Sequence, residues 1–348
     1  MTALRTGSPA LPRPAGGTAP RALRARVSPQ RLRADVEALA RPRGRLHAPQ
    51  EMARAEELVR ASLEEAGWRV DRRPFTFHDA EGNLDHDPPE GDRRTRYAKL
   101  EGANLVATPK PCVQGRRIVV AAHLDTVPDS PGADDNASAV AALLELARVL
   151  DPQGLKQTPV LAILDMEEIG FFGARAFVQS EAPNTITGAL VLESVGYSTA
   201  EPRSQGVPTG VGLLYRDQIR QLRRRELRGD WTLVVYRAAF RQLAHAVADP
   251  LAEIAGRDRV LTIREPLDFP LLGPILGRLV PWTREFARSD HVEFWRAGIP
   301  AVQITDTANF RNPNYHEPTD TPETLDYEYL ADVVAATACA LERLCSQG

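Results

Sequence analysis

Helical and strand-like spacings of apolar residues divide the first hundred positions into clear segments. The spacing predicts a helix that starts at Ser28-Pro29 and a second helix whose apolar face runs from Met52 to Ala66. Gly67 is expected to end the second helix, and a strand from Val70 to Phe77 follows. Residues 78–96 are rich in Asp, Gly and Pro, which predicts an exposed loop.

Short apolar runs then alternate with helical patterns. The predicted strands are Ala103 to Ala107, Arg117 to Ala122, Val160 to Leu164, Ala189 to Leu192 and Ile299 to Ile304. Helices are expected from Ala137 to Leu150 and, at the end of the chain, from about Leu330 to Leu344. This alternation predicts an α/β fold with a mixed, largely parallel central sheet and helices on both faces.

The segment from Tyr197 to Arg288 is less regular. It holds an arginine-rich helical stretch from Tyr215 to Arg228, a strand from Trp231 to Tyr236, an amphipathic helix to about Ala255, and a loop with several prolines. Aromatic residues are not interleaved with the arginines, so a solvated helix face is the favoured interpretation over a nucleic-acid surface.

Composition and charge narrow the class of protein. The 348 residues are 43% hydrophobic and carry a net charge of -3, so no overall positive field attracts nucleic acid or anionic lipid. The apolar run from Leu271 to Val280 is interrupted and too short to span a bilayer. The three cysteines have no metal-type spacing and are expected to be buried free thiols. The sequence does not indicate an oligomeric state.

Residues 1–27 are rich in Arg, Pro, Gly and Ala and lack acidic residues. We expect a disordered basic tail, because the segment has no apolar core of the length that a signal peptide needs. An organelle transit peptide is a weaker alternative, since the prolines disfavour an amphipathic helix. The simplest expectation is a cytoplasmic protein without membrane contact.

Polar residues with catalytic potential follow the first predicted parallel strands. His123 and Asp125 stand just past a strand end, two positions apart, where a histidine and a nearby acid suit a metal ligand and its orienting partner. Asp134 and Asp135 precede a helix, where adjacent acids serve equally well as helix caps or as ligands that bridge two cations.

Further acids and histidines follow the later strands. Glu167 and Glu168 come after a buried strand, so that one could bind a metal while the other faces a water as base. Glu193 lies at the next strand end, and His316 lies in the loop between the last strand and the last helix. Asp290 and His291 precede that last strand. Each alone is unremarkable, but together they form a set of nitrogen and oxygen ligands without thiolate. Such a set suits Zn²⁺ first, with Co²⁺ or Mn²⁺ as possible substitutes.

Six motifs resemble those of the M28 family of zinc metallopeptidases, the aminopeptidase-type enzymes with two co-catalytic zinc ions. In chain order they read AHLDTV, PGADDNASA, EEIGFFG, LESVGY, SDHVEFWRAGIPA and NPNYHEPTDT. The resemblance covers most of the chain from about Leu32 onward. It implies a catalytic domain over residues 28–348, in which residues 197–288 form an insert that borders the active-site cleft.

The resemblance also implies a role for each matched residue. His123 and Glu193 would hold one metal, Glu168 and His316 the other, and Asp135 would bridge them, with Glu167 as general base, Asp125 orienting His123, and Asp290 and His291 supporting the site. A non-proline cis peptide bond is expected between Asp135 and Asn136. Two departures from the common motif, Ala139 in place of glycine and Glu193 in place of aspartate, remove no ligand.

Substrate-binding residues are harder to assign. The Tyr315 hydroxyl could stabilise the oxyanion, although an ordinary packed aromatic side chain is an equal alternative. Arg311 and Arg288 could bind a substrate carboxylate, and structural roles are the competing interpretation.

The resemblance predicts a zinc-dependent exopeptidase acting on peptides or amino-acid derivatives, with an aminopeptidase as the first hypothesis. The alternatives are a carboxypeptidase or N-acyl amino acid deacylase on the same two-zinc site, a glutaminyl-cyclase-like acyltransferase with one zinc, and an inactive interaction domain. The complete ligand set argues against the last two.

Overall fold

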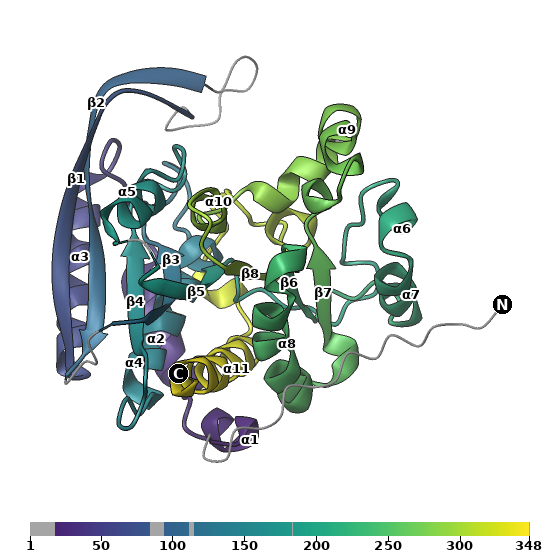
Figure 1. Ribbon diagram of the computed structural model, residues 1–348, viewed down its shortest axis with the longest axis horizontal. Coiled ribbons are helices and arrows are strands. Elements are labelled where there is room, and N and C mark those ends of the chain that lie inside the picture. Colours follow the sequence, from purple (N-terminus) through teal and green to yellow (C-terminus); the bar gives the residue numbers. More distant parts are fainter. Residues whose placement is uncertain (1–17, 84–93, 111–114, 183, 348) are drawn as a thin grey trace.

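A computed structural model describes residues 18–83, 94–110, 115–182 and 184–347. Its centre is an eight-stranded mixed sheet (Figure 1). The strands are β1 Trp68–Asn83, β2 Arg94–Pro109, β3 Arg117–His123, β4 Thr158–Leu164, β5 Ile186–Glu193, β6 Thr232–Tyr236, β7 Val260–Arg264 and β8 Ala301–Thr305. They lie in the order β1-β2-β4-β3-β5-β8-β6-β7.

The middle of this sheet is parallel and its two margins reverse direction. Strands β4, β3, β5 and β8 run parallel to one another, whereas β1, β2 and β4 pair antiparallel. Strand β6 runs antiparallel to β8 and carries β7 beside it in parallel. The predicted fold class is therefore confirmed, and residues 197–288 add two strands to the central sheet.

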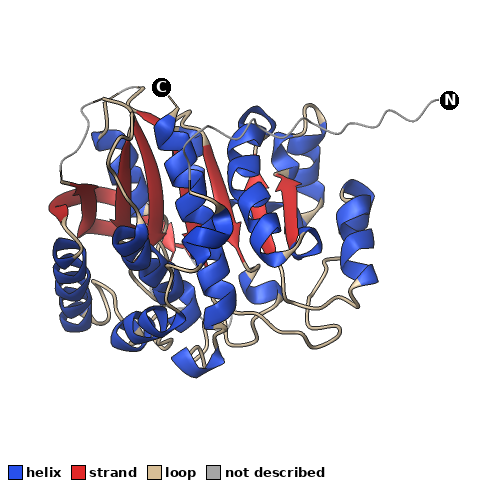
Figure 2. Ribbon diagram, turned by 90° about the horizontal axis from the view of Figure 1, so that it is seen from below, coloured by secondary structure: helices blue, strands red, loops and turns tan. Residues whose placement is uncertain are grey.

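Helices cover both faces of the sheet (Figure 2). They are α1 Pro20–Arg24, α2 Pro29–Leu39, α3 Pro49–Glu65, α4 Ala139–Val149, α5 Phe172–Ser180, α6 Val211–Leu214, α7 Arg216–Arg224, α8 Arg241–Ala255, α9 Leu272–Leu279, α10 His291–Arg296 and α11 Tyr327–Ser346. The α2 start agrees with the sequence, because the Ser28 hydroxyl accepts a hydrogen bond from Arg31 N at 3.2 Å. On α7 only Ile219 and Leu222 are buried, which leaves its arginines on a solvated face.

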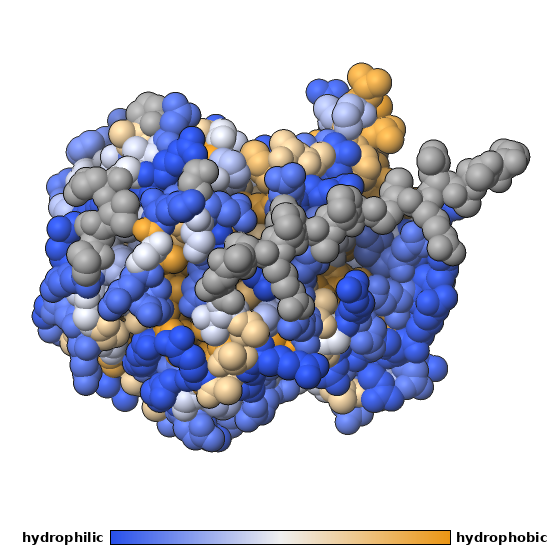
Figure 3. All heavy atoms as spheres, turned by 60° about the horizontal axis from the view of Figure 1, so that its bottom comes forward, coloured by the Kyte–Doolittle hydropathy of each residue, from blue (hydrophilic) through white to orange (hydrophobic). Residues whose placement is uncertain are grey.

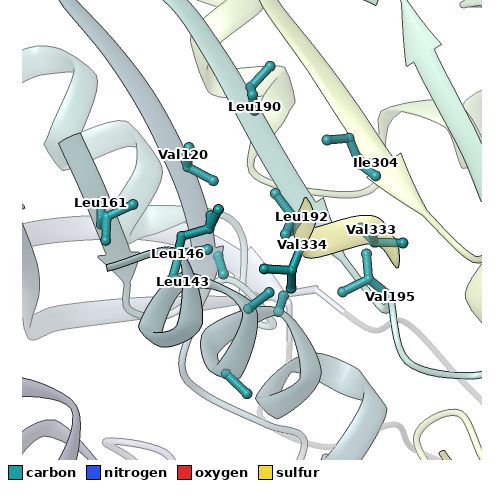
Figure 4. Packing of buried hydrophobic residues seen from close by; sticks show 14 of the residues in the cluster. Val120, Leu143, Leu146, Leu161, Leu190, Leu192, Val195, Ile304, Val333 and Val334 are labelled. Carbon is teal, nitrogen blue, oxygen red and sulfur yellow. The ribbon is translucent and has the colours of Figure 1, made fainter. Parts of the chain in front are cut away.

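Successive residues of each central strand point into different cores. Val120 and Leu192 pack on the face covered by α4 and α11, whereas Val119 and Val191 pack on the opposite face. Figure 4 shows the first of these cores, in which strand residues meet side chains such as Leu143 of α4. Two-sided burial explains why these strands are continuous apolar runs in the sequence.

The N-terminal segment differs from the expectation. Disorder was predicted up to residue 27, but residues 20–24 form α1, and Leu23 and Val27 are buried. Arg24 hydrogen-bonds Asp332 of α11 at 2.5 Å. Leu23 and Val27 pack into the hydrophobic core. The many Arg and Pro residues around them dominate the composition, so the sequence does not show this packing. Residues 1–17 lie outside the described residues, as does Cys112, while Cys339 and Cys345 are buried.

Two other predicted loops are partly regular. Strands β1 and β2 form a long ribbon that includes residues 78–83 and 94–96, because β pairing overrides the local turn composition. Strand β7 and helix α9 lie in the proline-containing segment after Ala255. Helix α9 exposes Leu272, Ile275 and Leu279, and apolar side chains gather on this projection of a mostly hydrophilic face (Figure 3).

Within the described residues, no helix combines the length and apolar character needed to cross a membrane.

Candidate metal centre

Four neighbouring strands end on one side of the sheet, and each leads into a candidate ligand. His123 is the last residue of β3, and Glu193 is the last residue of β5. Glu167 and Glu168 follow the end of β4, and His316 comes from the loop after β8. Because these strands are parallel neighbours, their carboxyl ends meet at the same edge and bring the side chains together.

The carboxylate of Asp135 lies between two histidines. Its Oδ1 is 3.1 Å from His123 Nε2, and its Oδ2 is 3.1 Å from His316 Nε2. Beyond the histidines, Glu193 Oε2 lies 3.4 Å from His123 Nε2, and Glu168 Oε2 lies 3.4 Å from His316 Nε2. These five residues form two triplets that share Asp135, with the donor atoms of each triplet within 4.8 Å of one another.

The donor atoms fit two zinc ions. Imidazole nitrogen and carboxylate oxygen are ordinary zinc ligands, and Asp135 offers one oxygen to each triplet. Among the described residues, Glu168 Oε1 is buried without a hydrogen-bond partner, and His316 Nε2 is buried and, although 3.1 Å from Asp135 Oδ2, is not aligned for a hydrogen bond. Buried polar atoms normally have partners, so these two atoms mark a position where a cation could complete the site.

Hydrogen bonds hold the turn that carries the shared Asp135 carboxylate. An irregular turn, Ala133–Ser138, carries Asp135 into α4, and the Asp135–Asn136 peptide bond is cis, which confirms that expectation. The Asn136 side chain donates to Leu192 O at 3.1 Å and thereby ties the turn to β5. The Asp320 carboxylate accepts a hydrogen bond from Asp135 N at 3.2 Å.

Asp125 contacts both the turn that carries Glu167 and Glu168 and the side chain of His123. Its two carboxylate oxygens accept hydrogen bonds from Glu167 N and Glu168 N, each at 3.1 Å. His123 Nδ1 is 3.1 Å from the Asp125 main-chain carbonyl and 3.6 Å from the nearer carboxylate oxygen. The carbonyl is thus the closer acceptor for His123, and the carboxylate chiefly anchors the turn that carries the two glutamates.

Glu167 has the environment of a proton acceptor. Its side chain is buried, and burial raises its pKa well above the usual range, while the positive charge of His123 acts in the opposite direction. Glu193 and Glu168 add like-charge repulsion that raises the pKa further. A carboxylate in this setting is a stronger base than an exposed one.

Ser289 is a polar partner that sequence reasoning missed. Its hydroxyl donates a hydrogen bond to Glu193 Oε2 at 2.7 Å. Burial raises the pKa of Glu193 to about 7. Ser289 was visible as the first residue of the SDH motif, but only the adjacent Asp290 and His291 were assigned supporting positions.

Asp290 and His291 point to different surroundings. Asp290 is buried, and neither of its carboxylate oxygens has a hydrogen-bond partner among the described residues. Burial raises its pKa, and His123 and Glu193 influence it through space, which places it beside the site. His291 instead bonds Phe286 O at 3.0 Å, and burial lowers its pKa to about 3. A neutral, packed role therefore fits His291.

Of the three candidate substrate-binding residues, Tyr315 and Arg288 lie at one pocket and Arg311 lies elsewhere. The Tyr315 ring stacks on the His316 ring at 3.9 Å between centroids. Tyr315 and Arg288 both line the pocket next to Glu193, and Arg288 donates to Glu285 at 2.6 Å. Arg311 is buried, lies 4.8 Å from the centre of the Trp231 ring and bonds Gln205 at 3.0 Å. Arg311 is thus packed inside the protein and does not line that pocket.

The pocket beside Glu193 has a volume of about 110 Å³ and is mainly apolar. It is formed by segments far apart in the sequence: β6, β7, the α6–α7 region, and the loops that contain Phe286 and Phe310. The apolar side chains around it include Val207, Val211, Ile219, Leu222, Leu233 and Ile263. Residues 197–288 supply most of this wall.

The family follows from comparison with known proteins. Residues 104–252 and 275–341 match the model of Peptidase family M28, which is more than half of the chain, and the chain belongs to this family. The protein is therefore a metallopeptidase, and the family indicates zinc as its metal.

Individual relatives agree with this placement. The chain is 34% identical over 249 residues to "Uncharacterized protein YfbL" of Escherichia coli, covering 66% of this chain and 68% of that protein. It is 30% identical over 245 residues to "Probable lipoprotein aminopeptidase LpqL" of Mycobacterium tuberculosis, covering 70% of this chain and 45% of that protein.

A solved structure and a third relative show the breadth of the fold. The zinc aminopeptidase BSAP from Bacillus subtilis superposes with a TM-score of 0.66 at 14% identity, covering 92% of this chain and 96% of that chain. A glutaminyl-peptide cyclotransferase of Boiga irregularis is 32% identical over 150 residues, covering 40% of this chain and 36% of that protein.

Proposed function

We propose that this protein is a two-zinc aminopeptidase that removes apolar residues from the N-termini of peptides. The observation that carries the proposal is the position of Asp135, whose two carboxylate oxygens each lie 3.1 Å from a different histidine. One shared carboxylate between two imidazole–carboxylate pairs supports a pair of ions rather than a single one.

Glu167 is the proposed general base. Zinc bound by the two triplets would lower the pKa of water and polarise the scissile carbonyl. Glu167 accepts the proton of the attacking water and then delivers it to the leaving amine. Asp125 supports this role, because it holds the main chain of Glu167 by a hydrogen bond.

Tyr315 is the proposed donor to the oxyanion. Burial raises the pKa of its hydroxyl, so the group stays protonated at neutral pH and can donate a hydrogen bond. Stacking on the ring of His316 restricts the orientation of Tyr315 next to a proposed metal ligand.

Charge at the site favours a substrate ammonium over a substrate carboxylate. Asp135, Glu168 and Glu193 are used by the proposed zinc ions, which leaves the buried carboxylates of Glu167 and Asp290 beside the site. Of the two arginines considered for a carboxylate, Arg311 is packed on Trp231 and Arg288 is already paired with Glu285. A free N-terminus near these acids therefore has more electrostatic support than a free C-terminus.

The adjacent pocket supports a preference for apolar side chains. It opens beside Glu193 and Tyr315, and its wall is mainly aliphatic and aromatic. An apolar side chain that enters it leaves water without leaving a charge unpaired, whereas a charged side chain would be desolvated there.

Peptides with blocked ends test the proposal directly. Zinc-replete protein would be given one apolar peptide in free, N-acetylated and C-amidated forms, with products identified by mass spectrometry and a chelator as control. We expect N-acetylation to abolish cleavage and C-amidation to leave it intact. Blockage by C-amidation would instead establish a carboxypeptidase, and release of the acyl group from an N-acyl amino acid would establish a deacylase.

Glutaminyl cyclisation is tested in the same experiment, because a cyclotransferase is among the relatives. A peptide with N-terminal glutamine would lose ammonia and keep its length if the protein were a cyclase. We expect no such product, since the second triplet of Asp135, Glu168 and His316 is complete.

A further inference from the structure

Arg43, in the connection between α2 and α3, is one of the largest fully buried side chains of the protein, with 1% exposure. Among the described residues, its guanidinium donates hydrogen bonds to main-chain carbonyls. They belong to Leu124 at 2.5 Å, Pro131 at 2.9 Å, Leu39 and Arg41 at 3.1 Å each, and Gly132 at 3.2 Å. A buried arginine without a carboxylate in hydrogen-bond contact is unusual, because burial of an unpaired charge is costly.

The carbonyls that Arg43 contacts belong to the loops that carry the metal ligands. Leu124 stands between His123 and Asp125, and Gly132 precedes the turn that presents Asp135. Main-chain hydrogen bonds strengthen the contact, since Arg43 N donates to Thr126 Oγ1 at 3.0 Å and Thr126 N donates to Arg43 O at 2.8 Å.

The same connection reaches the third ligand-bearing loop through Arg45. Its Nε donates to Asp165 Oδ2 at 2.7 Å, and the other side of its guanidinium pairs with Glu56 of α3. Asp165 lies two positions before Glu167 and also accepts a hydrogen bond from Ala103 N at 2.9 Å. Residues 43–45 therefore touch the loops after β3 and β4 and the turn before α4.

We propose that Arg43 is a positioning residue of the metal centre, which fixes the separation between His123 and Asp135 by joining their two loops through one guanidinium. The inference rests on the proposed two-zinc function. Only arginine has a rigid fork that can satisfy carbonyls on both loops at once, whereas lysine is a compact charge on a flexible stem. Partners that orient metal ligands commonly change metal affinity by about 10- to 100-fold when removed.

Arg43→Lys removes the forked guanidinium but keeps a positive charge near Asp125 and Asp135. It therefore tests the geometry of the hydrogen bonds apart from the charge. Zinc affinity would be measured for wild type and variant by competition with a chromophoric chelator, together with the melting temperature of the metal-free protein. We expect zinc affinity to fall about 10- to 100-fold. Arg148→Lys is the matched control, since Arg148 joins α4 to Asp35 of α2 and contacts none of the ligand-bearing loops.

The outcomes distinguish positioning from plain stabilisation. A structural role alone would lower the melting temperature of Arg43→Lys, as of Arg148→Lys, and leave zinc affinity unchanged, which would overturn the inference. If the wild type itself binds no zinc, the proposed function fails first.

If Arg43→Lys does not fold, Thr126→Val takes its place, because it removes the acceptor of Arg43 N and so loosens the main chain that holds the guanidinium between the two loops. Thr126→Ser keeps that acceptor. We expect weaker zinc binding in Thr126→Val and wild-type binding in Thr126→Ser. Equal affinity in both would contradict the inference.

Discussion

Two regions of the molecule meet at Glu193 and differ in their chemistry. One is the edge of the sheet at the ends of β3, β4 and β5, and the other is the pocket wall formed mostly by residues 197–288. The edge concentrates buried charge, and its loops are held by hydrogen bonds such as those that Glu167 N and Glu168 N donate to the Asp125 carboxylate. The wall is mainly apolar, and its members come from scattered segments. In the proposed function, the edge performs the reaction and the wall selects the substrate.

If the edge performs the reaction, Glu167→Gln should have the largest effect. The amide keeps the shape of the side chain but cannot accept the proton, so we expect kcat to fall about 100- to 10,000-fold. Zinc content should remain that of wild type, because Glu167 is not among the five proposed ligands. Steady-state kinetics and metal analysis of the same preparation check both parts. Retained turnover would remove Glu167 from the role of base.

This division also explains what the sequence could reveal. His123 ends β3, Glu193 ends β5, and Glu167 and Glu168 come soon after β4, so the strand pattern and the parallel topology together place these residues at one site. Asp135 and His316 lie further along the loops after β3 and β8, where no strand end marks them. The family resemblance then implied a role for each of them. Asp320 and Ser289 were missed because their bonds to the Asp135 main chain and to Glu193 join residues far apart in sequence.

The elements of the pocket wall could not be predicted from strand ends in this way. The sequence predicts a loop where β7 lies, because a five-residue edge strand beside prolines gives little periodic signal. Its residue Ile263 lines the same pocket as Val211 and Phe310, which lie far from it in the sequence. The segment 78–96 was assigned to a loop for a related reason: the pairing of β1 with β2, rather than local composition, extends both strands.

A second test of the edge removes one ligand. His316→Ala leaves Asp135 and Glu168 without their imidazole partner, so we expect zinc content to decrease and turnover to fall by at least about tenfold. His245→Ala on α8 is the control, because His245 is a partly exposed histidine that lies 3.9 Å from Asp249. Metal analysis after dialysis checks the result. Unchanged zinc stoichiometry in His316→Ala would exclude it from the ligands.

The pH dependence of zinc binding tests whether His316 and Glu193 at the sheet edge bind the metal. In the metal-free protein, burial lowers the pKa of His316, but Glu168 and Asp135 outweigh it and raise the pKa to about 11. Burial raises the pKa of Glu193 to about 7. Zinc requires both groups without their protons, so binding must release protons at neutral pH.

Zinc affinity should consequently fall as the pH falls, by about tenfold per pH unit for each proton released. Calorimetry in two buffers with different protonation enthalpies measures the number of protons. Zinc binding without proton release between pH 6 and pH 8, roughly the range around the Glu193 pKa, would be inconsistent with these ligands.

The smallest effect is expected from the wall. Val211→Phe on α6 places a larger side chain at the pocket, so peptides with a bulky apolar N-terminal residue should lose kcat/KM by about tenfold, whereas peptides with N-terminal alanine should be nearly unaffected. Leu213→Phe is the control on the same helix, because Leu213 is 77% exposed and does not line the pocket. Kinetics with a paired alanine and phenylalanine series checks this selectivity. If both substrates lost activity equally, the pocket would serve the reaction at the edge rather than the choice of side chain, and the proposed division between the two regions would be wrong.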